Sequence, residues 1–159
     1  PVLLIGVSMG AATVMMASGL DLPGCVRGII ADCGYTSPRA IYESVMSRFG
    51  RITPALVRTA EALAKRRVGF WFDDGDTRTE LIKNKLPITI VHGTGDTFVP
   101  CSMSYENYEA AKQSGADCRL LTVENAEHAL SFLTEKQKYL NEIDMMLEKC
   151  IVENDKKRM

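Results

Sequence analysis

The opening stretch, PVLLIGVSMG, limits the folds available to this chain more than any other segment. Residues 2–7 are apolar and rich in β-branched side chains, a pattern typical of a strand buried on both faces. A helix pattern of small residues follows at 10–18, and a second buried-strand pattern lies at 25–32. Two such strands separated by a helix predict a parallel sheet with a crossover connection, and therefore an α/β fold.

The remaining patterns extend this sheet and interrupt it once. Strand patterns at 87–91 and 118–123 enclose a helix pattern at 102–113. Residues 38–80 instead contain helix patterns and no strand pattern. We therefore predict a mostly parallel sheet with helices on both faces, and a helical cap inserted at 38–80.

A final helix is predicted near the C-terminus. Thr134 and Gln137 have the spacing of a capping box at its start. Its apolar side chains recur at i, i+3 and i+4 steps and define one face: Leu140, Ile143, Leu147 and Cys150. This pattern is typical of an amphipathic helix that covers a core.

Composition argues against several classes of function. The 159 residues carry a formal net charge of −1, so no global field attracts nucleic acid or an anionic membrane. No apolar stretch approaches the ~20 residues that a membrane span needs. The five cysteines are odd in number and scattered, which favours reduced thiols and a cytoplasmic location over disulfides or a zinc site: Cys25, Cys33, Cys101, Cys118 and Cys150.

The segment Gly6-Val7-Ser8-Met9-Gly10 has the pattern Gly-x-Ser-x-Gly between a predicted strand and a predicted helix. In that context the serine occupies a sharp, strained turn, and the two glycines remove side chains that would clash with the backbone. Ser8 is therefore the candidate nucleophile, and the Met9 N–H at the helix start is a candidate oxyanion donor. The alternative is a glycine-rich turn that binds a phosphate or nothing.

A serine hydroxyl needs a general base to act as a nucleophile at neutral pH. The chain has two histidines. His92 ends an apolar strand pattern, where a packing role is more common. His128 lies in a polar loop after the last strand, and loops carry catalytic groups more often than strand bodies do. We favour His128 as the base.

The base in turn needs a carboxylate to orient it. Asp96 lies in the glycine-rich segment HGTGDTFVP after a strand, and Asp32 ends the preceding strand in GIIAD. The nearby glycines favour Asp96, because they let the backbone present its carboxylate at the edge of the sheet. Asp32 remains the alternative acid, or a cap of a helix or turn.

Ser8, Asp96 and His128 follow each other along the chain in the order of the α/β-hydrolase fold. The segments GVSMGAA, VHGTGDTFVP and AEHALSF resemble three signature segments of bacterial serine hydrolases in that superfamily, in its esterase and peptidase-like branch. The resemblance covers essentially the whole chain. It implies that residues 1–159 form one incomplete domain, the C-terminal portion of the family's domain.

The resemblance also implies which parts are absent. The first strand corresponds to the family's fifth, so four strands and the loop with a second oxyanion donor are not in this sequence. We expect a piece of a larger hydrolase with weak or no turnover, because losing one donor costs ~10²–10³-fold in rate. A first strand without its neighbour also predicts self-association through that strand.

The predicted function is a serine hydrolase that cleaves carboxylic esters, or thioesters or short peptides, in a small-molecule acyl substrate. Ser8 attacks, His128 transfers the proton, Asp96 orients His128, and no metal or organic cofactor is required. Two alternatives stay open. One is an acyltransferase with the same triad, and the other is a non-catalytic α/β-hydrolase-like interaction domain.

Four aromatic residues are candidates for the wall of an acyl pocket. Tyr35 follows the second strand pattern, and Phe70, Trp71 and Phe72 lie in the predicted cap. The alternative for such a cluster is simple packing of the cap onto the body, because aromatic side chains prefer cores.

Overall fold

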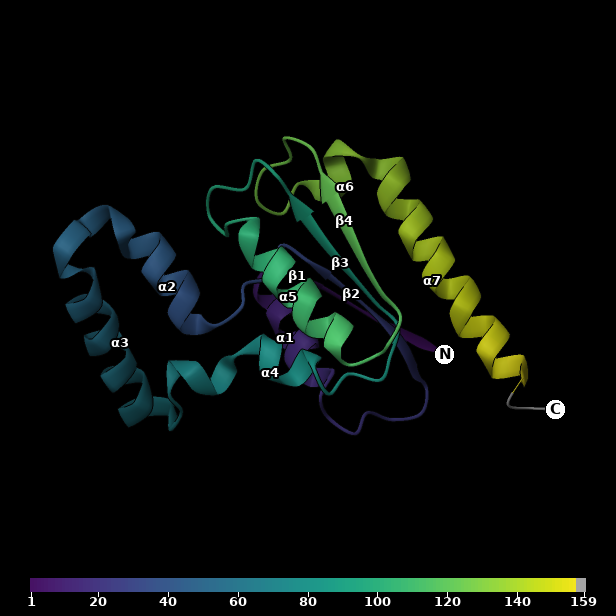
Figure 1. The fold of residues 1–159 in the computed structure, drawn as a ribbon, viewed down its shortest axis with the longest axis horizontal. Helices are drawn as coiled ribbons and strands as arrows, with labels where there is room; N and C mark the ends of the chain where they lie inside the picture. Colours follow the sequence, from purple (N-terminus) through teal and green to yellow (C-terminus); the bar gives the residue numbers. More distant parts are fainter. Residues whose placement is uncertain (157–159) are drawn as a thin grey trace.

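The computed structural model describes residues 1–156, with side chains for 1–47 and 49–150. Four parallel strands form one sheet in the order β1 (Val2–Val7), β2 (Val26–Asp32), β3 (Ile88–Gly93) and β4 (Cys118–Val123), as Figure 1 shows. All four strands therefore end at the same edge of the sheet. The predicted parallel α/β sheet is confirmed.

Helices cover both faces of the sheet, because neighbouring residues of each strand point to opposite sides. On one face Ile29 and Ala31 of β2 pack with α1 (Met9–Ala17), α4 (Thr77–Leu81) and α5 (Ser102–Gln113). On the other face Ile30 packs with Tyr139 of α7 (Lys136–Lys156). Burying each such isoleucine contributes roughly 1.5–3 kcal/mol. The two faces form two core clusters, and the central strands β2 and β3 lie between them.

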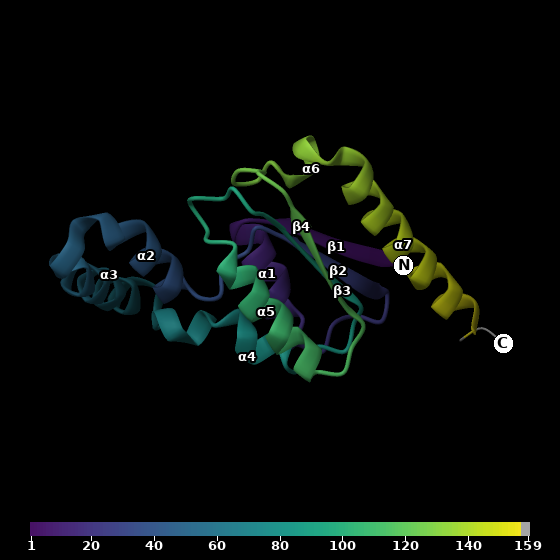
Figure 2. The same ribbon diagram turned by 45° about the horizontal axis from the view of Figure 1, so that its top comes forward.

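The segment between β2 and β3 is helical and extends away from the sheet (Figures 1 and 2). It contains α2 (Pro38–Met46), the 3₁₀ turn η1 (Ser47–Ile52), α3 (Thr53–Val68) and the 3₁₀ turn η2 (Phe72–Gly75). Arg39 of α2 ties these elements together, since it pairs with Glu61 at 2.7 Å and with Asp73 at 2.6 Å. The last helix of the segment, α4, packs on α1 and α5 and so joins the body.

The C-terminal helix differs from its prediction in two respects. Thr134 instead ends a short helix, α6 (Ser131–Thr134), where its hydroxyl donates to the Leu130 carbonyl, and α7 begins at Lys136, so Thr134 does not directly precede its first turn. Leu147, placed on the packed face by the pattern, is 41% exposed, whereas Met146 is buried. The buried face of α7 is rotated because Tyr139 packs beneath its first turns, in the core cluster of Ile30. No helix of the described residues is both long and apolar enough to cross a bilayer.

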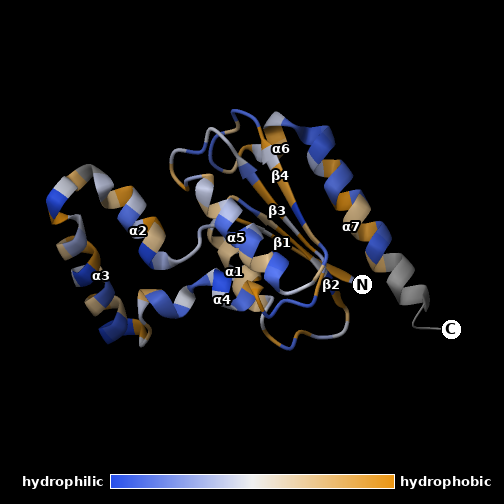
Figure 3. Ribbon diagram, viewed as in Figure 1, coloured by the Kyte–Doolittle hydropathy of each residue, from blue (hydrophilic) through white to orange (hydrophobic). Residues whose placement is uncertain are grey.

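The edge strand β1 gives the first testable prediction. Among the described residues β1 pairs with β2 alone, and its Val2, Ile5 and Val7 are 44%, 48% and 45% exposed. Figure 3 shows the hydropathy along the chain, with this strand at the edge of the sheet. Unpaired edge groups beside apolar side chains favour pairing with another strand. Light scattering should therefore report a mass of at least twice 17.6 kDa. Ile5→Lys should restore the monomer, and a wild-type monomer at every concentration would refute the prediction.

Candidate active site

Ser8 lies in the turn between β1 and α1, in a backbone conformation that few residues other than glycine adopt. Its φ is 55° and its ψ is −115°. The turn is so tight that a Cβ on Gly6 would lie 2.2 Å from the Gly10 carbonyl oxygen, so only glycine fits at position 6. The Ser8 N–H donates to the Asp32 carbonyl at 2.8 Å, which fixes the turn against the end of β2. The strained turn leaves the Ser8 hydroxyl above the carboxyl edge of the sheet.

The structure brings Ser8, His128 and Asp96 together at this edge. His128 Nε2 lies 2.9 Å from Ser8 Oγ, and His128 Nδ1 lies 2.7 Å from Asp96 Oδ2. His128 comes from the loop after β4, and Asp96 comes from the loop after β3. A carboxylate oxygen only accepts, so Nδ1 carries the proton and Nε2 is left to accept from the serine hydroxyl. This geometry can pass the Ser8 hydroxyl proton to His128 while Asp96 holds the imidazole in place.

Asp96 is held rigidly by its own loop. Its side chain is fully buried, and Oδ1 accepts backbone N–H bonds from Phe98 and Val99, each at 2.9 Å. These two donors fix which carboxylate oxygen faces His128. The Phe98 ring packs edge-on against the imidazole, with ring centroids 5.0 Å apart.

His92 supports the same loop from below. It is fully buried, and its Nε2–H donates to the Val99 carbonyl at 2.9 Å. The same nitrogen lies 3.4 Å from Asp96 Oδ2, whereas Nδ1 has no partner among the described residues. His92 therefore occupies a structural position beneath the acid and does not contact Ser8 through any described hydrogen bond.

Asp32, the alternative acid, holds the loop that carries His128. Its carboxylate accepts from the Ser131 hydroxyl at 2.9 Å. Burial raises the pKa of Asp32, and hydrogen bonds from Ser131 and Tyr139 partly offset that rise. Ser131 and Tyr139 were not identified from the sequence, since one resembles a helix-start serine and the other an ordinary core position. Only the fold shows that they meet one carboxylate.

Cys33 lies close to this cluster. Its sulfur lies within 4.8 Å of the ligand atoms of Asp96 and His128, the one such group of potential metal ligands among the residues described. A metal there would have to displace the hydrogen bond between His128 and Asp96. It would also need a thiolate, whereas burial raises the pKa of Cys33 to about 12. The three residues are therefore poorly suited to hold a metal.

The same pKa predicts how the cysteines react. Alkylation requires the thiolate, so brief treatment with iodoacetamide near neutral pH should modify the exposed Cys25 and leave the buried Cys33 unmodified. Peptide mass mapping measures both sites in one sample, and unfolding the protein first should make both react. Equal modification of the two thiols in the folded protein would show that Cys33 is not buried as described.

An apolar cavity of about 300 Å³ opens beside Ser8. Tyr35 lines it, as predicted, together with Met9, Pro38, Ile41, Tyr42, Val45 and Phe98. Phe70, Trp71 and Phe72 do not line it, so their assignment to the pocket is corrected. Phe72 is buried and stacks on Tyr42 with ring centroids 4.8 Å apart, while Trp71 and Phe70 are 47% and 43% exposed. Phe72 therefore packs η2 against α2 within the insertion, whereas Phe70 and Trp71 stay largely exposed.

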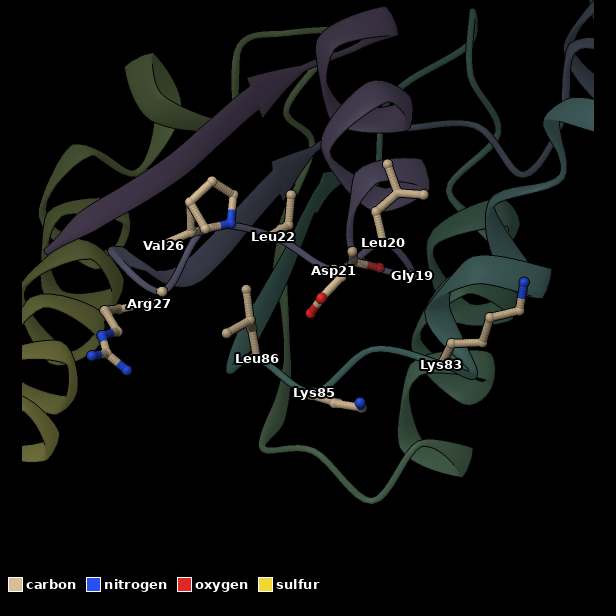
Figure 4. A pocket seen from close by; sticks show the side chains of 12 residues that line it. Gly19, Leu20, Asp21, Leu22, Val26, Arg27, Lys83, Lys85 and Leu86 are labelled. Carbon is tan, nitrogen blue, oxygen red and sulfur yellow. The ribbon is translucent and has the colours of Figure 1, made fainter. Parts of the chain in front are cut away.

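A second cavity, of about 450 Å³, lies at the opposite end of the sheet (Figure 4). Residues 18–24, Lys83, Lys85 and Leu86 line it together with Val26 and Arg27 at the start of β2. The strands begin at this end, whereas Ser8 follows the end of β1. This cavity therefore does not belong to the site around Ser8.

We compared the chain with known protein families and with curated proteins. No protein-family model matches the chain. It is 24% identical over 144 residues to the uncharacterised protein YqkD of Bacillus subtilis, spanning 90% of this chain and 46% of that protein. The chain therefore spans about half the length of this relative.

Solved structures give the clearest likeness. The Pyrococcus furiosus esterase Pf2001 superposes with a TM-score of 0.67 at 17% identity, over 92% of this chain and 52% of the esterase. The acylaminoacyl peptidase of Pyrococcus horikoshii gives 0.65 at 15%, over 93% of this chain and 24% of the peptidase. The monoacylglycerol lipase of Paleococcus ferrophilus gives 0.62 at 18%, over 92% of this chain and 68% of the lipase. The chain has a partial α/β-hydrolase fold.

Proposed function

We propose that this chain is the part of a serine hydrolase that carries its catalytic triad, and that it cleaves carboxylic esters through an acyl-enzyme. One observation carries the proposal. Ser8 Oγ, His128 and Asp96 form a continuous hydrogen-bonded relay with donor–acceptor distances of 2.9 and 2.7 Å. The esterase, peptidase and lipase of similar fold support the same class of reaction.

Each step follows from the relay. Ser8 Oγ forms a bond to the acyl carbon while its proton passes to His128 Nε2, and the carbonyl oxygen becomes an oxyanion. Met9 begins α1, so its N–H has no partner within the helix and can donate to that oxyanion. The carbon–oxygen bond to the leaving alcohol then breaks, and the alcohol takes the proton from His128. Water attacks the acyl-enzyme in the same way, which releases the acid and restores Ser8.

The cavity beside Ser8 supports an apolar acyl group. Its walls from α2 are the side chains of Ile41, Tyr42 and Val45, and Met9 closes the side next to the nucleophile. No charged side chain lines it among the residues described. Burying the apolar surface of an acyl chain in this cavity stabilises the bound substrate by roughly 25 cal/mol for each Å² removed from water.

Hydrolysis of p-nitrophenyl esters tests the proposal. We expect the butyrate and hexanoate esters to be cleaved faster than the acetate, because their acyl chains reach further into the cavity. Turnover should be slow, since Met9 supplies a single identified donor and one donor is worth about 10²–10³-fold. Ser8→Ala should reduce the rate to background. Equal rates for wild type and Ser8→Ala would refute the proposal, and ester products formed with added alcohol would indicate acyl transfer.

A further inference from the structure

The outward side of α3, together with the last residue of η1, carries a row of partly exposed apolar side chains. Ile52, Leu56 and Leu63 are 57%, 37% and 51% exposed. Their spacing of four and seven residues places them along one line of the helix. Thr53, Val57 and Glu61 are buried on a neighbouring side of the helix, so the helix packs through that side and leaves the apolar row largely exposed.

Arginines flank this row and have no acidic partner among the described residues. Arg51 and Arg58 lie beside its N-terminal half, and Arg66 and Arg67 lie at its C-terminal end. Within the described residues no carboxylate lies within ion-pair distance of these four, whereas Arg39, Arg78 and Arg119 each pair with at least one. The one acidic residue between 51 and 68 is Glu61, which is buried against Arg39. The outward side of α3 is therefore strongly basic, although the whole chain has a net charge of −1.

The position of α3 makes this side accessible. The helix lies at the far end of the insertion, away from the sheet, in both ribbon views (Figures 1 and 2), and hydrophobic and hydrophilic residues alternate along it (Figure 3). It is joined through η1 to α2, which lines the cavity beside Ser8. A large partner that binds α3 would therefore lie next to α2, which forms one wall of the cavity.

We propose that Arg51, Ile52, Leu56, Arg58, Leu63, Arg66 and Arg67, here called the α3 surface, bind a lipid bilayer with anionic headgroups. The apolar row enters the interface, and the arginines lie among the phosphates. The positive charge favours an anionic bilayer. It disfavours a second copy of the chain, because two α3 surfaces facing each other would bring their arginines together and repel. This proposal is compatible with the low net charge of the whole chain, because the attraction comes from four arginines gathered on one surface. The proposal does not depend on the proposed hydrolase activity.

Sedimentation with vesicles tests the proposal. Wild type and Ser8→Ala should sediment equally with vesicles of phosphatidylcholine mixed with phosphatidylglycerol, and far less with phosphatidylcholine alone. Removing two basic residues in Arg66→Gln/Arg67→Gln should weaken binding about 30-fold, since each contributes about 1 kcal/mol near an anionic surface. Leu56→Asp/Leu63→Asp should also weaken binding, because it removes the apolar contact.

A matched control uses a surface away from α3, at the end of the sheet where the strands begin. Leu20 is 66% exposed and Lys85 is exposed, and both line the cavity in Figure 4. Leu20→Asp/Lys85→Gln should bind as wild type does, and circular dichroism should show that every variant is folded. The proposal is overturned if neither vesicle binds, if both bind equally, or if the control loses as much affinity as the α3 variants. Binding to polyglutamate without binding to anionic vesicles would overturn it too, in favour of an acidic protein partner.

Discussion

Replacing Asp96 with asparagine should lower kcat for ester hydrolysis about 10⁴-fold, the loss that a wrong histidine tautomer causes in a serine–histidine–aspartate triad. The loop dictates this outcome. The N–H groups of Phe98 and Val99 both donate to Oδ1, so an asparagine must place its carbonyl oxygen there. Its NH₂ group then faces His128 Nδ1, which is forced to accept. Nε2 is left protonated and cannot accept the Ser8 proton.

Asp32→Asn is the matched control for this prediction. Asp32 is also a buried carboxylate at a strand end, but it bonds Ser131 and not the imidazole of His128. An asparagine oxygen still accepts from the Ser131 hydroxyl, so we expect a loss of about tenfold or less, within the range of one neutral hydrogen bond. Steady-state kinetics on both variants measures the difference. The reverse order of effects would make Asp32 the acid.

Gly6→Ala should both destabilise the protein and prevent its reaction. The added Cβ would lie 2.2 Å from the Gly10 carbonyl oxygen and 2.7 Å from the Ala11 nitrogen. Both are backbone atoms of α1, so the helix must move away from β1 and carry the Ser8 turn with it. Overpacking of this kind costs about 3 kcal/mol or more. Urea unfolding should show a lower midpoint, and a reactive-serine probe should no longer label Ser8.

The second glycine of the motif provides the control. The expected clash is wrong for Gly10, because a Cβ there meets no atom within 4 Å, and Gly10 lies in the first turn of α1. Gly10→Ala should therefore leave labelling intact and stabilise the helix by up to about 1 kcal/mol. Equal damage from the two substitutions would show that the turn does not depend on the close approach at Gly6.

The sheet was predictable because its signals are local. Residues 2–7 and 88–93 are short apolar runs next to a helix or a glycine-rich turn, and parallel strands must end at a common edge. Ser8, Asp96 and His128 each follow such a strand, so their meeting could be inferred from topology alone. The choice of Asp96 over Asp32 depended on two glycines, and the hydrogen bonds agree with it.

The features that were not predictable depend on contacts between distant segments. The buried face of α7 is set by packing around Tyr139, which a periodicity argument does not detect. Phe72 differs from Phe70 and Trp71 because it stacks on Tyr42, a residue thirty positions earlier in the chain. The link from Asp32 to Ser131 joins residues 99 positions apart in the chain.

Reaction with a fluorophosphonate tests the role of Ser8 without requiring turnover. The Ser8 oxygen forms a bond to phosphorus, fluoride leaves, and His128 accepts the hydroxyl proton. Intact mass and peptide mapping after brief treatment at neutral pH should find one adduct, on Ser8, which is lost in Ser8→Ala and strongly slowed in His128→Ala. An unmodified protein, or an adduct on another residue that persists in Ser8→Ala, would show that this hydroxyl is not an activated nucleophile.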